Sequence, residues 1–140
     1  MFKLGIEVLD RAEPRLQELG LTGRQYAALA ILDGDQPKSQ HELGQLMGLR
    51  GQIIVGLADE LERLGLVERR RSTDDRRRTE IVLTKAGARV LVEADAVGQD
   101  IERSVLAVLN DSQREVFLAS VQRVMQSQWT PCQPTEYDGA

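Results

Sequence analysis

Arginine side chains crowd one short stretch of this sequence. Six of them fall within the ten residues from Arg69 to Arg78. A guanidinium group keeps its positive charge and donates paired hydrogen bonds, which suits it to phosphate. From Arg63 to Lys85 the chain carries eight basic and four acidic residues, a balance of +4, whereas the whole chain has a net charge of −4. The remaining residues therefore sum to −8, and this asymmetry predicts one phosphate-facing surface on an otherwise acidic protein.

Catalytic and metal-binding chemistry, by contrast, lack their usual parts. The chain has one cysteine, Cys132, and one histidine, His41, which together cannot form a multi-ligand zinc site. It also has no glycine-rich phosphate loop and no acidic cluster at metal spacing. We expect neither enzyme activity nor a cofactor or metal. We expect His41 to be a surface residue and Cys132 an incidental thiol, with a redox switch as the alternative for Cys132.

The spacing of capping and apolar residues predicts a helix-turn-helix just before the arginines. Residues Ser39–Glu42 form a capping box that opens a short helix, and Gly48–Arg50 supplies a tight turn. A second helix is expected from Gly51 to Leu64. Two strands follow, from Leu66 to Arg71 and from Thr79 to Thr84, joined by the turn-forming residues 72–75. The arginines are therefore expected on a β-hairpin beside a helix-turn-helix.

Amphipathic helices flank this unit. One is expected over Phe2–Leu19, where Pro14 predicts a kink or a break near Glu13, and another begins at the cap Thr22. After Thr84 a stripe of about 25 residues predicts a long helix, followed by a last helix capped by Asn110. The fold class is mainly α with a small β-hairpin wing (α+β): a winged helix-turn-helix core with N- and C-terminal dimerisation helices.

We expect a single domain over residues 1–140. Residues 22–84 form the DNA-binding lobe, residues 1–21 and 85–129 the dimerisation helices, and residues 130–140 a flexible tail. The terminal apolar stripes need a partner, which predicts a two-fold homodimer with Trp129 as an anchor of its core. No basic leader and no apolar run of about 18 residues is present, so a cytoplasmic protein with no membrane partner is expected.

Several motifs, in this order and spacing, resemble the MarR family of bacterial regulators. They are Leu19–Thr22 with Gln25-Tyr26, Ser39 with Glu42-Leu43, the run Leu61–Arg69, and Asp75–Arg78 followed by Leu83–Gly87. The resemblance implies a homodimer whose recognition helix enters the major groove of double-stranded DNA and whose wing reaches the minor groove. It further implies a regulator, usually a repressor, that acts on a palindromic operator and is released by a small aromatic or phenolic effector.

The resemblance also assigns roles to individual residues. Arg77 corresponds to the minor-groove arginine and Asp75 to the residue that orients the wing, while Arg76 and Arg78 are expected at phosphates. Phe2, Arg11, Arg15 and Tyr26 are candidates to line an effector site, for instance for an aromatic carboxylate; packing is the favoured interpretation for Phe2 and Tyr26, and surface charge for Arg11 and Arg15. The full set of expected DNA contacts is Ser39, Gln40, Arg50, Gln52, Ile53, Arg63, Arg76, Arg77 and Arg78.

The expected recognition helix departs from the family pattern. Its start offers Arg50 for guanine or phosphate, Gln52 for adenine and Ile53 for a thymine methyl group, with few other base-reading side chains. We therefore expect modest base discrimination, with the wing and phosphates contributing much of the affinity. The alternative is a winged-helix module that docks on another protein and has little specific DNA binding.

Overall fold

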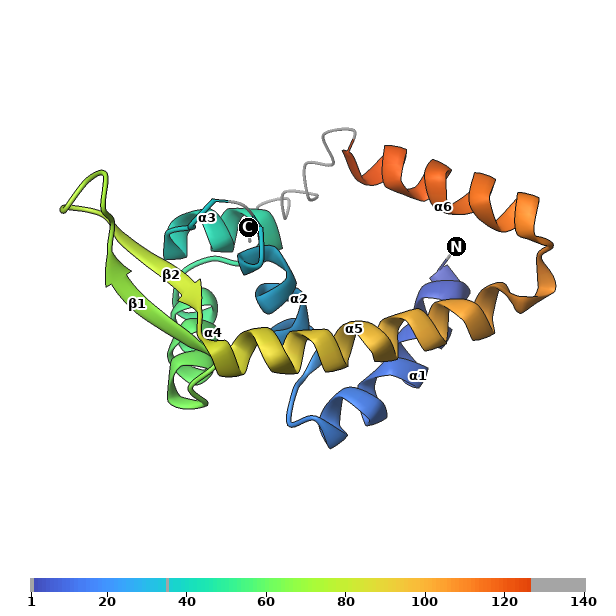
Figure 1. The fold of residues 1–140 in the computed structure, drawn as a ribbon, viewed down its shortest axis with the longest axis horizontal. Helices are drawn as coiled ribbons and strands as arrows, with labels where there is room; N and C mark the ends of the chain where they lie inside the picture. Colours follow the sequence, from blue (N-terminus) through green and yellow to red (C-terminus); the bar gives the residue numbers. More distant parts are fainter. Residues whose placement is uncertain (1, 35, 127–140) are drawn as a thin grey trace, which may run out of the picture. The chain divides into compact units, whose positions relative to one another are not determined.

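The computed structural model describes residues 2–34 and 36–126 (Figure 1). The chain divides into two compact units, one ending at Ser104 and one beginning at Val105. Its elements are α1 (Phe2–Glu18), α2 (Gly23–Leu32), α3 (Gln40–Met47), α4 (Gln52–Arg63), β1 (Val67–Arg71), β2 (Thr79–Leu83), α5 (Lys85–Val105), the 3-10 turn η1 (Leu106–Val108) and α6 (Asp111–Gln126). This order confirms the expected mainly helical fold with one β-hairpin.

Capping boxes open α2 and α3, as the sequence predicts. Ser39 Oγ accepts a hydrogen bond from the backbone N–H of Glu42 at 3.3 Å, and Glu42 Oε2 accepts one from the backbone N–H of Ser39 at 2.7 Å. Thr22 and Gln25 make the same reciprocal pair at the start of α2. Each box satisfies two backbone donors that a helix start leaves without partners. The first turn of α3 is therefore fixed by its own side chains.

Helix α4 begins after a glycine that the backbone requires. Gly51 is the N-cap with φ +54° and ψ −129°, a conformation that residues with a Cβ rarely adopt. One face of α4 then enters the core through Ile54, Leu57, Ala58 and Leu61, each at most 6% exposed. The other face is left to solvent, and it includes the first two residues of the helix.

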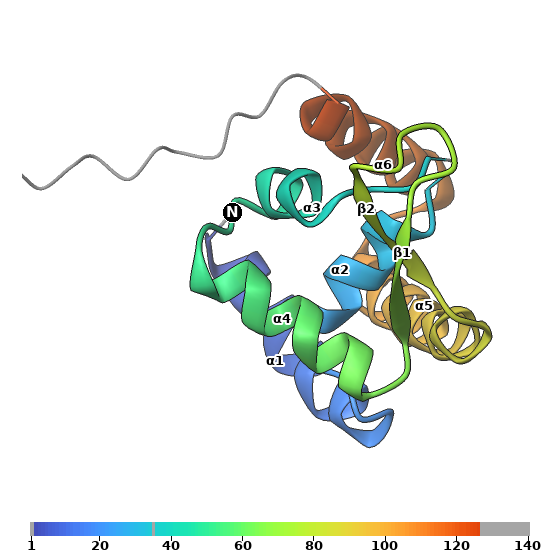
Figure 2. The same ribbon diagram turned by 90° about the vertical axis from the view of Figure 1, so that its left-hand side faces the viewer.

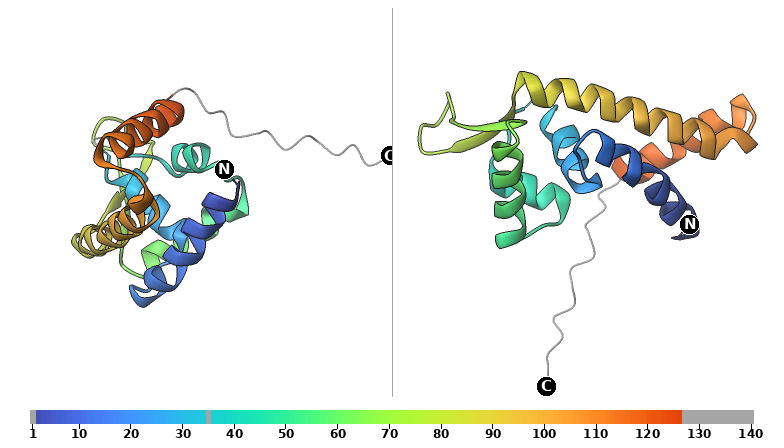
Figure 3. Two further views of the ribbon diagram at one scale, coloured as in Figure 1. Left: turned by 90° about the vertical axis from the view of Figure 1, so that its right-hand side faces the viewer. Right: turned by 90° about the horizontal axis from the view of Figure 1, so that it is seen from below.

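Strands β1 and β2 form an antiparallel hairpin in the register Val67↔Leu83 to Arg71↔Thr79. Its base is tied to the helix-turn-helix, because the backbone N–H of Ile81 donates to the carbonyl of Lys38 at 2.8 Å, just before α3. The loop that joins the strands projects beyond α3 and α4 (Figures 2 and 3). The hairpin therefore has the position of a wing beside the helix-turn-helix.

A single apolar cluster joins these elements. Its largest fully buried side chains come from the turn before α2, from α2, α3, α4 and both strands: Leu21, Leu29, Leu43, Leu61, Val67 and Ile81. Leu16 of α1 and Leu91 and Ala94 of α5 extend the cluster. Burying these side chains is the main source of stability, about 25 cal/mol for each Å² of apolar surface removed from water.

Two helix boundaries differ from expectation. Pro14 lies inside a continuous α1, so the expected break near Glu13 is wrong. Hydrogen bonds from Arg11 and Arg15, on either side of Pro14, hold this helix against α5. Helix α5 has 21 residues rather than about 25 and tightens into the turn η1. Leu109 then leaves the helix with φ −97° and ψ 141°, because Asn110 must cap α6 through Gln113.

The second unit consists of η1 and α6 in the part that the structure describes. Asn110 Oδ1 accepts a hydrogen bond from the N–H of Gln113 at 2.9 Å, and Gln113 Oε1 accepts one from the N–H of Asn110 at 3.1 Å. This pair confirms the predicted cap. Val116 of α6 is 64% exposed. Trp129, Cys132 and the predicted tail lie outside the described residues.

Membrane-spanning helices and metal-binding clusters are both absent from the described residues. No helix among them is both long and apolar enough to span a bilayer. No group of three or more histidine, cysteine, aspartate or glutamate side chains within the same residues is arranged to hold a metal ion.

The junction of wing and α5 yields a prediction about Gly87. A Cβ built on this residue would lie 2.0 Å from the carbonyl oxygen of Leu66, which itself accepts the N–H of Thr84 at 3.0 Å. Gly87→Ala must push this backbone apart, so we expect a loss of about 1–3 kcal/mol in the free energy of unfolding, measured by urea denaturation.

Gly98→Ala, in the same helix, is the matched control. Its Cβ would meet Tyr26 Oη at 3.5 Å, an ordinary contact. Removing a glycine from a helix interior should then raise stability by up to about 1 kcal/mol. Equal effects of the two substitutions would show that the close approach at Leu66 has no energetic weight.

Candidate nucleic-acid interface

The exposed start of α4 is the first part of the candidate interface. Arg50 lies in the turn before the helix, and Gln52 and Ile53 are its first two residues. All three are exposed, Ile53 to 54%. An apolar side chain so far out of the core is available to contact a thymine methyl group, and the glutamine amide matches the donor and acceptor pattern of adenine. These three expected contacts therefore share one exposed helix end.

The loop at the tip of the wing is organised by its own short polar side chains. Ser72, only 5% exposed, accepts hydrogen bonds at Oγ from the N–H groups of Asp74 at 3.3 Å and Asp75 at 3.5 Å. Asp75 Oδ1 in turn accepts from the N–H of Arg77 at 2.9 Å. This turn holds Arg76 and Arg77 outward, and their side chains make no ion pair among the described residues. The wing-orienting role predicted for Asp75 requires this geometry.

Three other arginines of the hairpin are already paired with carboxylates. Arg69 binds Asp59 and Glu62, Arg70 lies 3.8 Å from Glu80 across the strands, and Arg78 binds Glu42. Arg71, Arg76 and Arg77 make no ion pair with any described residue. The six-arginine stretch therefore presents about half of its charge to a ligand. The other half neutralises acidic side chains of the protein itself.

Arg69 connects β1 to both helices of the helix-turn-helix. Its guanidinium donates to Asp59 Oδ1 at 2.6 Å, to Glu62, and to Gln40 Oε1 at 3.1 Å. Burial lowers the pKa of the Arg69 guanidinium. The hydrogen bonds and charges of Asp59 and Glu62 outweigh this effect, so the pKa of Arg69 is raised. Two negative charges of α4 are thereby neutralised within the protein, which lowers the electrostatic cost of bringing this helix to a polyanion.

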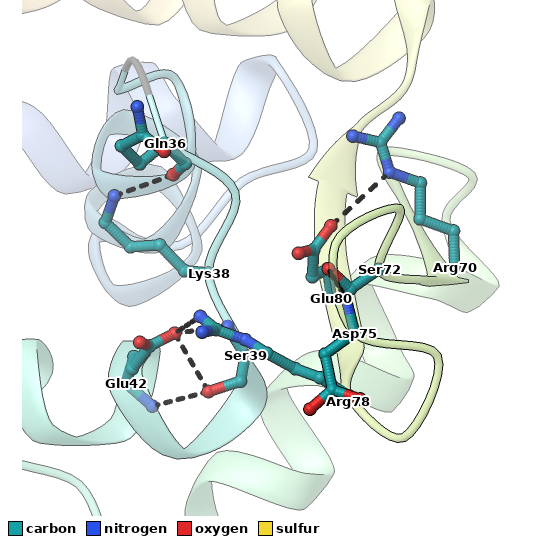
Figure 4. A network of polar contacts seen from close by, with 9 residues as sticks. All are labelled: Gln36, Lys38, Ser39, Glu42, Arg70, Ser72, Asp75, Arg78 and Glu80. Atoms are coloured by element: carbon teal, nitrogen blue, oxygen red, sulfur yellow. Dashed lines mark hydrogen bonds and ion pairs between the residues drawn. The ribbon is translucent and has the colours of Figure 1, made fainter.

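Arg78 crosses from the loop of the wing to α3, where its guanidinium binds Glu42 (Figure 4). The same carboxylate oxygen, Glu42 Oε2, also accepts hydrogen bonds from the N–H and the hydroxyl of Ser39 at 2.7 and 3.0 Å. Hydrogen bonds from the Ser39 backbone and hydroxyl, with the charge of Arg78, hold the pKa of Glu42 below its ordinary value of 4.5. Glu42 is therefore ionised at neutral pH and fixed in place.

Three further residues expected at DNA are engaged within the protein. Ser39 caps α3 and Gln40 accepts from Arg69. Arg63 lies 3.9 Å from Glu60 one turn earlier in α4, and its side chain is 70% exposed. The structure thus brings Arg50, Gln52 and Ile53 together at one helix end and Arg76 and Arg77 together at the loop.

Comparison with known proteins decides the family. Residues 19–78 match the MarR family. The organic hydroperoxide resistance transcriptional regulator of Bacillus subtilis (strain 168) is 30% identical over 106 residues, which cover 76% of this chain and 69% of that protein. The chain belongs to the MarR family. It is a transcriptional regulator of that family. Its relatives, including a second regulator of B. subtilis, are transcriptional regulators, which confirms the expectation that this chain is not an enzyme.

Solved structures agree on the fold of this MarR-family chain. CouR from Rhodococcus jostii RHA1, bound to p-coumaroyl-CoA, is 28% identical with a TM-score of 0.76, covering 91% of this chain and 90% of that one. A probable transcriptional regulator from Pseudomonas aeruginosa is 29% identical with a TM-score of 0.71, covering 87% and 91%. The winged-helix fold class is thereby confirmed.

The residues expected near an effector line up along α5. Arg11 donates to Ser104 Oγ at 2.8 Å and also pairs with Glu7, one turn earlier in α1. Arg15 donates to Asp100 Oδ2 at 3.0 Å, and Tyr26 Oη donates to Asp95 Oδ1 at 2.9 Å. The side chain of Phe2 lies outside the described part. Arg11, Arg15 and Tyr26 thus connect α1 and α2 to α5.

Sequence reasoning about this MarR-family chain missed the carboxylates that bind its arginines. The pairing of Arg70 with Glu80 could have been predicted, since a hairpin that closes between Arg71 and Thr79 puts Glu80 opposite Arg70. The pairing of Arg78 with Glu42 joins residues 36 positions apart. No local pattern in the sequence signals such a contact.

Tyr26 yields a prediction about pH dependence. Burial first, then its hydrogen bond to Asp95 and the charge of that carboxylate, raise the pKa of Tyr26 from 10.0 to about 12. The unfolded chain loses this proton at lower pH than the folded chain does. Tyr26 therefore stabilises the fold fully below pH 10, and this contribution is lost as the pH rises toward about 12.

Tyr26→Phe tests both the hydrogen bond and the pH effect. We expect it to cost about 1 kcal/mol at neutral pH because Asp95 loses a donor. The difference from wild type, measured by denaturant titration, should shrink above pH 10. Ultraviolet absorbance provides a direct check, since the chain has two tyrosines and the variant should lose the later-titrating one. A stability difference that grows with alkalinity would contradict the assignment.

Proposed function

We propose that this protein is a homodimeric, ligand-responsive and sequence-selective DNA-binding regulator that represses transcription from a palindromic operator. One observation carries the DNA-binding part: Arg76 and Arg77 are held outward on the wing loop and make no ion pair with any described residue, in a unit that also exposes the start of α4. A polyanion is the partner that uses such charges, because it releases condensed counterions when they bind. The acidic remainder of the chain keeps this attraction local.

The two surfaces suit the two grooves of DNA. Gln52 and Ile53, exposed at the start of α4, suit the base edges and thymine methyl groups of a major groove. Arg77, at the tip of a narrow loop, is suited to the concentrated negative potential of an A·T-rich minor groove. Arg50 and Arg76 then contact phosphates. This arrangement makes groove shape and backbone charge the main sources of affinity, with a small base-specific contribution.

Homodimer formation rests on apolar surface at the N-terminal helix. Leu4, Ile6 and Leu9 of α1 are 38%, 42% and 62% exposed. Helix α1 thus has a buried stripe that contacts the core and further apolar side chains at the surface. A second copy of the chain would cover these, and two-fold symmetry would present two wings and two α4 helices to one duplex. We assign residues 1–21 and 85–129 to this role.

The effector we propose is an aromatic carboxylate or a thioester of one, bound near Arg11, Arg15 and Tyr26. Asp100 and Ser104 now accept hydrogen bonds from these arginines, and a ligand carboxylate could replace them. CouR, of the same fold, is bound to p-coumaroyl-CoA, which supports the choice of ligand class. The organic hydroperoxide resistance named for the B. subtilis relative is not carried over, because the single cysteine of this chain, Cys132, is expected to be an incidental thiol.

Selection from random duplexes tests the DNA-binding proposal and supplies the ligand for later measurements. We expect a roughly palindromic site with half-sites about one helical turn apart. Arg77→Ala should then weaken binding to the selected duplex by roughly tenfold and reduce the slope of log affinity against log salt by about 1, because one charge contact is lost.

Arg24→Ala is the control for Arg77→Ala. Arg24 is an exposed arginine of α2 with no ion pair among the described residues, so its removal changes the net charge equally. Affinity and slope should then stay close to wild type. If the protein selects no duplex at any salt concentration, the chain is better described as a winged-helix module that docks on another protein.

The dimer has its own test. Leu9→Glu puts a charge on the most exposed of the three α1 side chains, and sedimentation equilibrium should show a shift from dimer toward monomer. Leu46→Glu is the matched control, because Leu46 is 59% exposed and lies on α3, outside the helices assigned to the dimer. A monomeric wild type, or a Leu9→Glu protein that dimerises as tightly as wild type, would rule out this use of α1.

A further inference from the structure

We propose that Arg78 is a positioning residue that binds Glu42 and thereby fixes the loop carrying Arg76 and Arg77, rather than a phosphate contact. The inference rests on the proposed DNA-binding function and assigns a different task to one of the wing arginines. It is supported by the backbone hydrogen bonds of Arg78, by the hydrogen bonds that hold Glu42, and by the lack of other contacts between the loop and α3 among the described residues.

The backbone of Arg78 closes the loop. Its N–H donates to the carbonyl of Asp75 at 2.9 Å, and its carbonyl accepts from the N–H of Ser72 at 2.9 Å. A displacement of Arg78 therefore displaces the turn in which Asp75 holds Arg77. The position of the Arg78 side chain controls the position of the two free arginines.

The side chain of Arg78 binds an acceptor that is already rigid. Glu42 Oε2 is held by the N–H and hydroxyl of Ser39 in the first turn of α3, so it loses little freedom when Arg78 joins it (Figure 4). The geometry joins the tip of the wing to the helix-turn-helix through one carboxylate. Arg76 and Arg77 have no comparable acceptor among the described residues.

Little else supports the loop. A hollow of about 680 Å³ lies between α3 and the loop, lined by Lys38, Gln45, Ser72, Asp75 and Glu80 among others. Packed side chains therefore do not brace residues 72–78 from this side. Among the hydrogen bonds and ion pairs of the described residues, the contact of Arg78 with Glu42 is the one that joins this loop to α3.

The two roles of Arg78 predict opposite effects of removing the charge of Glu42. If Arg78 contacts a phosphate, Glu42 competes for it, and Glu42→Gln strengthens DNA binding. If Arg78 positions the loop, Glu42→Gln weakens binding as Arg78→Gln does. Glutamine is accepted at this place in a capping box, so the start of α3 is preserved in the variant.

The experiment is a double-mutant cycle of Glu42→Gln and Arg78→Gln on the selected duplex at several salt concentrations. Each single substitution should weaken binding by about two- to fivefold, as expected of a partly exposed ion pair, with an unchanged salt slope. The double substitution should weaken it no further than either single one. Arg76→Gln, the matched control, should lower the slope by about 1.

Nuclear magnetic resonance relaxation of the loop amides in the free protein gives a readout that does not need DNA. Glu42→Gln and Arg78→Gln should both increase the motion of residues 73–77, while Arg76→Gln should not. Tighter binding by Glu42→Gln, a lower salt slope for Arg78→Gln, additive effects or unchanged loop motion would each overturn the proposal. If the wild type selects no duplex, the proposed function fails, and the loop motions still decide whether the pair holds the wing.

Discussion

Competition for arginine side chains is the constraint on which the interface depends. The hairpin carries six guanidinium groups, and carboxylates of α3, α4 and the neighbouring strand bind three of them. A guanidinium that binds a carboxylate of the protein fixes two structural elements relative to each other, because it donates several hydrogen bonds in a set geometry. One that remains free gives attraction to phosphate. The wing therefore needs both kinds, and the acidic residues around it decide which arginine does which.

The same division explains how an acidic protein can present a helix-turn-helix to DNA. Helix α4 carries Asp59, Glu60 and Glu62 in its second half, which would repel a phosphate backbone. Arg69 neutralises two of them and Arg63 lies beside the third. The start of α4, with Arg50 and Gln52, carries no such acidic residue. Charge is thus arranged along the helix so that its first turns could approach a polyanion at the least electrostatic cost.

Local chemistry made much of this fold predictable, and distant contacts made the rest unpredictable. The capping boxes at Ser39 and Thr22 and the turn residues after Arg71 are short-range signals, so helix starts and the hairpin could be located from the sequence. Helix α1 continues through Pro14 and donates hydrogen bonds from Arg11 and Arg15 to α5, about 90 positions away, contacts that no local pattern encodes. The pairing of Arg78 with Glu42 was missed for the same reason, since the two residues lie 36 positions apart in the sequence.

Few side chains at the start of α4 can read bases, and this shifts the task of discrimination to the wing. A loop whose two free arginines are held at a fixed place can measure groove width, since the narrow groove of an A·T-rich segment attracts a guanidinium more strongly. A mobile loop would distinguish narrow from wide grooves less well than a rigid one. Ser72 and Asp75 define the shape of the loop, and the hydrogen bond between Ile81 and Lys38 fixes its base. Under the proposed function, selectivity would therefore depend on the hydrogen-bonded frame of the wing as much as on the residues that contact DNA.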